Sequence, residues 1–202
     1  MKKRSVLSKE EILQCAETVF RRFGPNKTSV TDIAKELNIS HGTIYRHYPS
    51  KEKLKEATTE KWLNEEIITP LEQLLEEHYE NSAQRLKQYI NKLVNLKHHF
   101  AFEDREMFKM YAEVTEQSAG LIHSHLDQIY KHLTFIIEEG MNSRKFQSFQ
   151  TSRENAVAVF HATERFHHPA HAYEWKEEKT KQEFEQVWYL IERGIIFRGG
   201  NP

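Results

Sequence analysis

Apolar residues recur at intervals of three and four along most of the chain, which is the spacing of one buried face of an α-helix. Near the N-terminus this pattern divides into three segments. The first follows a capping pair, Ser8 and Glu11, and ends at Gly24, whereas the second breaks at Asn38. Strand-like alternation of apolar and polar residues never persists for more than a few positions. The pattern therefore predicts an all-α protein.

Longer helical patterns fill the rest of the chain. One begins at Lys51, and Pro70 is expected to kink or divide it because proline has no backbone N–H to donate. Further helices are predicted at about 82–100, 103–118, 119–139, 152–167 and 176–197, with non-helical segments at 140–151 and 167–175. We expect an N-terminal domain at 1–50 and a second helical domain at 51–202.

The second and third helical segments are joined by "NIS", which has the length of the turn in a helix-turn-helix motif. The apolar positions that would pack these helices together are Val30, Ile33, Ala34, Leu37, Ile39 and Ile44. The rest of the third segment is unusual, because Gly42 is followed closely by Tyr45, Arg46 and His47. Glycine weakens a helix, and these polar-tipped side chains cannot all be buried. Packing alone does not explain this composition.

A surface that lies against double-stranded DNA does explain it. A recognition helix enters the major groove with its N-terminal end. Gly42 would let the duplex approach the backbone, Thr43 would contact a thymine methyl group or a base edge, and Arg46 would bind guanine through two hydrogen bonds. Tyr45, His47 and Lys51 would hold phosphates.

The complete predicted DNA-contacting set also includes the start of the second helix, where the Thr28 hydroxyl would hold a phosphate. Its members are Thr28, Ser29, Ser40, His41, Gly42, Thr43, Tyr45, Arg46, His47 and Lys51. The alternatives are that Ser29 serves only as a helix cap and that His41 is only solvated. Tyr48 is expected in the core.

Charge and composition agree with a partner that is a polyanion. The net charge is −1, but residues 1–60 carry 12 lysines and arginines against 8 acidic residues, and the rest carries 17 against 22. The single cysteine, Cys15, excludes an internal disulfide and a CxxC site. No apolar run approaches the roughly 18 residues of a membrane span, and the basic start is not followed by a signal-peptide segment. We therefore expect a cytoplasmic protein with no membrane partner.

The stretch "TSVTDIAKELNISHGTIYRHYPSKEKL", residues 28–54, resembles the tetracycline-repressor (TetR) family of bacterial transcription regulators. The similar parts are "DIA", then "GTIYRHY", then "SKE" at this spacing. The family usually has lysine where this chain has His41, and often tyrosine or phenylalanine at Arg46. The resemblance implies a homodimer that binds a pseudo-palindromic operator, an effector pocket in the C-terminal domain, and repression relieved by an unidentified small molecule.

Apolar stripes on the last two predicted helices suggest where two subunits would meet. The candidate interface residues are Phe160, Phe184, Val187, Trp188, Ile191 and Ile195. Such stripes suit a four-helix interface, and the alternative is that they are internal core. A dimer also agrees with a helix-turn-helix, since one short recognition helix reads few bases, and two would read half-sites about 34 Å apart.

The effector pocket is expected among the helices between about 100 and 170. Its candidate residues are Phe102, Phe108, Tyr111, Phe135, His161, Glu164 and His168. For the four aromatic residues the alternative is ordinary core. His161, Glu164 and His168 would also suit a single Zn²⁺ or Ni²⁺ ion, so a metal-responsive regulator that uses the histidine-rich segment 161–171 is an alternative. A cap at a helix end, a polar pocket wall or a place at the dimer seam is favoured over that metal site, and no cofactor is expected. The pairs His98–His99 and His123/His125 are expected at the surface.

An enzyme is not expected. The chain lacks HExxH, GxSxG, a phosphate-binding loop and a second ExxH motif that would complete a helical di-metal site. A helical metalloenzyme built on the histidines is only a remote alternative. The sequence leaves open the operator, the effector, the regulated genes and the choice between repressor and activator.

Overall fold

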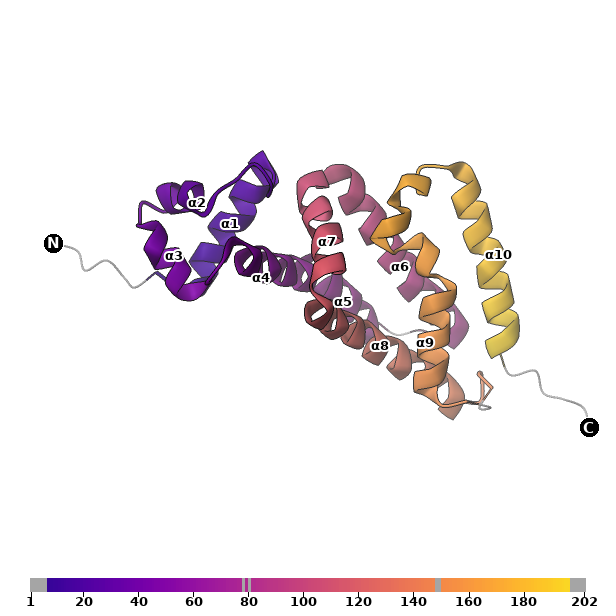
Figure 1. Ribbon diagram of the computed structural model, residues 1–202. Coiled ribbons are helices and arrows are strands. Elements are labelled where there is room, and N and C mark those ends of the chain that lie inside the picture. Colours follow the sequence, from indigo (N-terminus) through magenta and orange to yellow (C-terminus); the bar gives the residue numbers. More distant parts are fainter. Residues whose placement is uncertain (1–6, 78, 80, 148–149, 197–202) are drawn as a thin grey trace, which may run out of the picture. The chain divides into compact units, whose positions relative to one another are not determined.

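The computed structural model describes residues 7–77, 79, 81–147 and 150–196, and its regular elements within these ranges are helices (Figure 1). An isolated bridge between Phe146 and Ile196 is the one β-type pairing there. The all-α prediction is confirmed. Of the described helices, none is long and apolar enough to cross a membrane.

The chain forms two compact units, and it passes between them three times. The first contains the described residues up to Asn64 together with Phe100–Ile122, and the second contains Glu65–His99 and the described residues from His123 onward. The helices that lie in the first unit are α1 (Lys9–Phe23), α2 (Val30–Glu36), α3 (His41–His47), α4 (Lys51–Leu63) and α7 (Arg105–Gln117).

The ends of the first helices follow the local signals in the sequence. The Ser8–Glu11 capping box begins α1, and Gly24 ends it with a φ of +83°. A second capping box, Ser29 with Asp32, begins α2. After α2, Asn38 adopts a φ of +53°, which lets the chain turn sharply toward α3.

The core of the first unit joins the three short helices to α4 and α7. Phe20 and Ile44 are fully buried, and the Trp62 ring lies 5.9 Å from that of Tyr111. Charged pairs link the same helices at their edges. Arg21 contacts Asp104 at 2.8 Å, and Lys55 contacts Glu113 at 2.8 Å. Together these contacts fix α1 and α4 against α7.

The second unit is built from longer helices and two short 3₁₀ turns. After a π-helical turn at Asn64–Ile68, Pro70 lies in the first turn of α5, where its missing donor costs little. The predicted division of the helix at Pro70 is confirmed. The other elements are α5 (Thr69–Glu76), α6 (Ser82–Glu103), α8 (Ala119–Asn142), α9 (Ser152–Ala162), the turns Glu164–Phe166 and Pro169–Glu174, and α10 (Glu178–Ile195).

Two predictions about helix limits are wrong. The helix expected to continue to 167 ends at Ala162, because the chain continues as a 3₁₀ turn. The segment expected to be irregular, 167–175, contains a second 3₁₀ helix that begins at Pro169. At the end of α8, a Cβ atom on Gly140 would overlap the Phe146 ring, so the following turn depends on this glycine.

Candidate nucleic-acid interface and interior polar site

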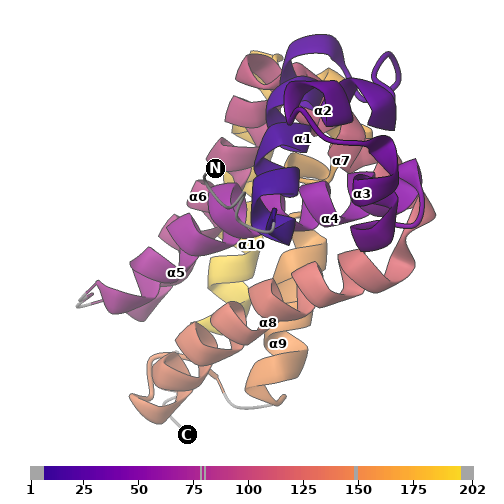
Figure 2. The ribbon, with the colours of Figure 1, turned by 90° about the vertical axis from the view of Figure 1, so that its left-hand side faces the viewer.

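The packing of α2 against α3 forms a helix-turn-helix (Figures 1 and 2). Ile33, Ala34 and Ile44 are buried between these helices, and the Ile39 N–H donates to the Ala34 carbonyl at 2.9 Å across the turn. Tyr48 is only 8% exposed, which confirms it as a core residue. The apolar side of α3 is therefore fixed, and its other side faces outward.

The outward side of α3 carries a connected polar group. Ser40 Oγ lies 3.0 Å from Thr43 Oγ1, and Arg46 Nη2 donates to Thr43 Oγ1 at 3.3 Å. Ser40, His41, Gly42, Tyr45 and Arg46 are exposed. Thr43, His47 and Lys51 are half-buried around them. The His41 and Tyr45 rings meet edge-on, with centroids 6.0 Å apart.

The N-terminus of α3 differs from those of its neighbours. Serine side chains accept backbone N–H groups at the starts of α1, α2 and α4, through Ser8, Ser29 and Ser50. At the start of α3, Ser40 makes no such side-chain cap, because its hydroxyl is directed at Thr43. The Thr43 N–H donates to the Ser40 carbonyl at 2.9 Å, but the Ser40 side chain accepts no first-turn N–H group of α3.

Gly42 has no role in the packing of the described residues. Of their atoms, the nearest to an added Cβ would be Ser40 Oγ at 3.8 Å, which is ordinary contact. By contrast, a Cβ on Gly24 would collide with the Glu106 carboxylate. An alanine would fit at position 42 and would favour the helix. The packing of the described residues therefore gives no reason for a glycine at this position.

Thr28 and Ser29 already have structural partners. Thr28 is 4% exposed and its hydroxyl donates to the Gly24 carbonyl at 2.8 Å. The expectation that this hydroxyl holds a phosphate therefore needs correction, since the group is buried and engaged. Ser29 is exposed, but its hydroxyl donates to Asp32 at 2.6 Å as part of the capping box.

The candidate pocket residues fall into the two units. Phe102, Phe108 and Tyr111 belong to the first, where the last two are at most 6% exposed and stack edge-to-face at 5.7 Å. Phe135 belongs to the second unit and is 44% exposed. It lines a hollow of about 420 Å³, where its ring lies 5.5 Å from the Arg85 guanidinium.

The histidine-rich segment does not assemble the proposed metal-binding triad. His161 Nδ1 lies 3.2 Å from Glu164, but His168 Nδ1 accepts the Ala170 N–H instead of joining them. Among the described residues, no group of three or more His, Cys, Asp or Glu side chains is arranged to hold a metal ion. The geometry of this segment favours a structural role.

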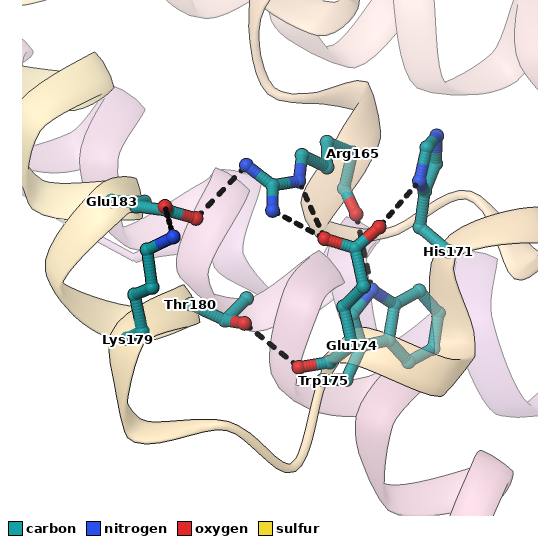
Figure 3. Close-up of polar contacts among 7 residues, drawn as sticks. All are labelled: Arg165, His171, Glu174, Trp175, Lys179, Thr180 and Glu183. Atoms are coloured by element: carbon teal, nitrogen blue, oxygen red, sulfur yellow. Dashed lines mark hydrogen bonds and ion pairs between the residues drawn. The ribbon is translucent and has the colours of Figure 1, made fainter.

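An ion-pair network holds that segment to α10 (Figure 3). Arg165 bonds to Glu174 and, at 2.9 Å, to Glu183, while His171 Nδ1 lies 3.1 Å from Glu174. The pKa of Glu174 is lowered to about 2, mainly by its hydrogen bonds from Arg165 and then His171. The Trp175 indole also donates to the Arg165 carbonyl at 3.1 Å. These contacts fasten the two 3₁₀ turns.

The predicted dimer residues are mostly core of the second unit. Phe160, Phe184, Trp188 and Ile195 are between 2% and 7% exposed within a single chain. Val187 and Ile191 are half-buried. The apolar stripe on these two helices is therefore mainly internal core of a single chain, which was the alternative to a dimer interface. The exposed apolar side chains of α10 are instead Tyr189, at 54%, and Leu190, at 70%.

The sequence-based interpretation missed a buried basic group in the second unit. Lys97, His125 and His167 are 2%, 5% and 3% exposed. His125 was expected at the surface and is buried, and His98 is half-buried and stacked on Trp175 at 4.4 Å. His99 and His123 are exposed, as predicted.

A helical spacing signal for this group does exist in the sequence. Lys97 continues the apolar stripe of Leu86, Ile90 and Leu93, and His125 lies one and two helical turns before Ile129 and Leu133. These positions put both basic residues on the inward faces of their helices.

Comparisons with known proteins agree with this architecture. A sequence model described as "Bacterial regulatory proteins, tetR family" matches residues 12–58. A second, described as "Tetracyclin repressor-like, C-terminal domain", matches residues 82–188. The chain is also similar to the biofilm operon icaADBC HTH-type negative transcriptional regulator IcaR of Staphylococcus epidermidis. They are 30% identical over 126 residues, 60% of this chain and 62% of that protein. With IcaR of Staphylococcus aureus, the identity is 23% over 75% of this chain and 79% of the relative.

Solved structures show the same fold. A transcriptional regulator from Cytophaga hutchinsonii gives a TM-score of 0.68 at 19% identity, with 92% of this chain and 97% of that chain covered. The transcriptional regulator FadR from Bacillus subtilis, in complex with stearoyl-CoA, gives 0.63 at 20% identity, with 93% and 100% covered.

Proposed function

Because the chain belongs to the tetracycline-repressor family of bacterial transcriptional regulators, we propose that it is a DNA-binding repressor that a small molecule releases from its operator. It is a regulator rather than an enzyme. The observation that carries the proposal is the outward face of α3, where a polar group surrounds a glycine that the described packing does not require. Residues 1–50 form the DNA-binding domain and 51–202 the effector-binding and dimerisation domain.

Individual roles on α3 follow from exposure and chemistry. Arg46 reads a guanine, with Thr43 holding its guanidinium in position. Gly42 allows close approach of the duplex. Tyr45 and Lys51 contact phosphates, which fix the register of the helix in the groove. His41, His47 and Ser40 complete the surface, and Ser29 contributes through its position beside α2.

The protein acts as a homodimer, because two recognition helices are needed to read a pseudo-palindromic operator. The surface that pairs is the outward side of α9 and α10, which pack on each other. Leu190 and Tyr189 are its exposed apolar side chains, and Ala158 and Ala162 of α9 are small and exposed. This replaces the buried stripe around Trp188 as the dimer contact.

Regulation is a shift between two states of the dimer. DNA prefers the state in which the recognition helices match the spacing of successive major grooves. An effector that binds the other state more tightly weakens DNA binding, and by reciprocity DNA weakens effector binding by the same factor. A cytoplasmic location accompanies this function, since the operator lies there.

The proposal is tested by selecting bound duplexes from a random pool with the purified protein. We expect a pseudo-palindromic consensus, and an affinity whose logarithm falls linearly with the logarithm of salt concentration. Retention of no duplex at low ionic strength would overturn the proposal.

A further inference from the structure

A hollow of about 420 Å³ lies in the second unit, lined by the end of α5, the start of α6 and the second half of α8. Of the aromatic residues predicted for the effector pocket, Phe135 is the one that lines it. The segments that follow α5 and α8 complete the wall with Tyr79 and Lys145. Its volume falls in the range of sites that hold small organic molecules.

An arginine holds the aromatic side of this hollow in place. The Arg85 guanidinium lies 5.6 Å from the centre of the Tyr79 ring and 5.5 Å from that of the Phe135 ring. The same guanidinium bonds to the Glu139 carboxylate and donates to the Leu75 carbonyl, so it joins α6 to α8 and α5. Because this wall is formed without a ligand, a ligand would lose little affinity in ordering it.

The apolar surface of the hollow is partly uncovered. Phe135 is 44% exposed, whereas Ile136, the next residue of α8 and also part of the lining, is 1% exposed. Leu75 is half-buried at the opposite end of the chain segment that closes the hollow. Covering the Phe135 ring would remove apolar area from water, so the hollow favours a ligand with an apolar body.

Apart from the pair formed by Arg85, the hollow carries charges of both signs that no described residue neutralises. Glu76 and Lys145 are exposed, and neither side chain forms a hydrogen bond or an ion pair with a described residue. Glu77 accepts a hydrogen bond from the Tyr79 hydroxyl at 2.6 Å. That phenol stays neutral, because burial and then this bond raise its pKa to about 12, so it leaves the charge of Glu77 in place.

These charges limit the kind of ligand. An anion without a positive group would meet the carboxylates of Glu76 and Glu77, and a cation without a negative group would meet Lys145. Like charges brought together in this way repel each other. A zwitterion presents an opposite charge to each side, and it can lie between Glu76 and Lys145 because these two do not pair with each other.

We propose that this hollow binds a small zwitterion with an apolar body, such as an amino acid or a short peptide, with its ammonium group toward Glu76, its carboxylate toward Lys145 and its body on Phe135. This inference rests on the proposed function, because it gives the chemical class of the effector. The bound molecule joins the end of α5 to the segment after α8, so it favours the arrangement of these elements in which it reaches both charges.

The test compares four forms of one molecule by isothermal titration of the full-length protein at about pH 6.5, where α-amino groups are charged. Leucylphenylalanine is the zwitterion. Its N-acetyl form is an anion, its amide is a cation, and the doubly capped form is neutral. Phenylalanine in the same four forms supplies a shorter distance between the charges.

We expect the zwitterion to bind most tightly for at least one of the two lengths. Each cap should weaken binding by about two- to fivefold, because ion pairs with exposed side chains are modest. A neutral form that binds as tightly as its zwitterion at both lengths would overturn the inference, and so would a singly charged form that binds more tightly, or no binding of any form.

Three variants locate the site. In the double variant Glu76→Gln, Glu77→Gln the acetyl cap should no longer weaken binding, and in Lys145→Met the amide cap should no longer do so. Phe135→Ala should weaken all four forms alike, by about tenfold. A variant that merely disturbed the fold would change all four forms together, so the selective loss of one cap effect identifies a contact.

Matched controls lie outside the lining of the hollow. Glu138→Gln removes an exposed carboxylate of α8, and Lys92→Met removes an exposed ammonium group of α6. Both controls should keep the full effect of each cap. Cap effects that persist in the glutamine and methionine variants of the hollow would contradict the site.

Duplex binding is measured separately on the same samples. A protein that binds its selected duplex but does not prefer the zwitterion refutes this inference and leaves the proposed function intact. A protein that binds the zwitterion but no duplex refutes the proposed function and leaves the binding site. A zwitterion that binds without changing duplex affinity refutes its role as the effector.

Discussion

The outer face of α3 and the interior around Lys97 both carry polar side chains that packing alone does not explain. Substitutions in the two regions are expected to affect the protein differently. On α3 the unusual residues are exposed, so we expect their replacement to change what the protein binds and hardly to change its stability. In the second unit, Lys97 and His125 are buried, so replacing either one also changes the free energy of unfolding. The comparison shows that a substitution at an exposed residue can change binding alone, whereas one at a buried residue also changes stability.

Trp188→Glu is expected to have the largest effect. Trp188 is 2% exposed, and an unpaired carboxylate there lowers the free energy of unfolding by about 4 kcal/mol or more. Leu190→Glu, two residues away and 70% exposed, should change stability by only about 0.5 kcal/mol while weakening the dimer. Chemical denaturation and sedimentation separate the two results. A folded Trp188→Glu monomer would instead return the dimer contact to the buried stripe.

The pH dependence of stability should reveal the buried lysine. The pKa of Lys97 is about 7 in the folded protein and about 10.4 in an unfolded chain, so the unfolded state binds more protons between these values. The free energy of unfolding therefore rises with pH across this window, by up to about 1.4 kcal/mol per pH unit. His125 and His167 remain neutral throughout, since their pKa values are lowered.

Lys97→Met provides the control for that slope. Denaturation of the parent and the variant between pH 7 and 9 should show a rise that only the parent has, and the variant should be the more stable at pH 7. Parallel curves for the two proteins would mean that Lys97 keeps its ordinary pKa in the folded state.

The contrast between the two regions also explains what the sequence could and could not predict. The helix-turn-helix depends on local signals, such as the cap at Ser29 and the turn at Asn38, which need no knowledge of the rest of the fold. The role of Trp188 cannot be predicted from such local signals, because an apolar stripe at helical spacing is the same whether its own chain or a partner covers it. Likewise, His125 is inward only because of the helices that pack around α8.

Arg46→Ala tests the reading role on the exposed face. Loss of two hydrogen bonds to guanine should cost about 1–3 kcal/mol of operator affinity and relax base preference at one position of each half-site. Stability should be unchanged because Arg46 is exposed. Repeating the duplex selection measures both effects, with Arg105→Ala, an exposed arginine of α7, as the control. An equal loss on every duplex would assign Arg46 to a phosphate.

Gly42→Ala should produce only a small gain in stability, and it separates the demands of folding from those of binding. Because the nearest described atom to the new methyl group is 3.8 Å away, the helix gains about 0.5–1 kcal/mol from the better helix former. Operator affinity should nevertheless fall by about tenfold, since the methyl group holds the duplex away from the backbone. Gly120→Ala is the matched control, because Gly120 lies in α8 and, apart from its chain neighbours and the backbone of its own helix, no described atom lies within 4 Å of an added Cβ there. If both alanine variants gain stability and both keep full operator affinity, the glycine in α3 does not mark the surface that meets DNA.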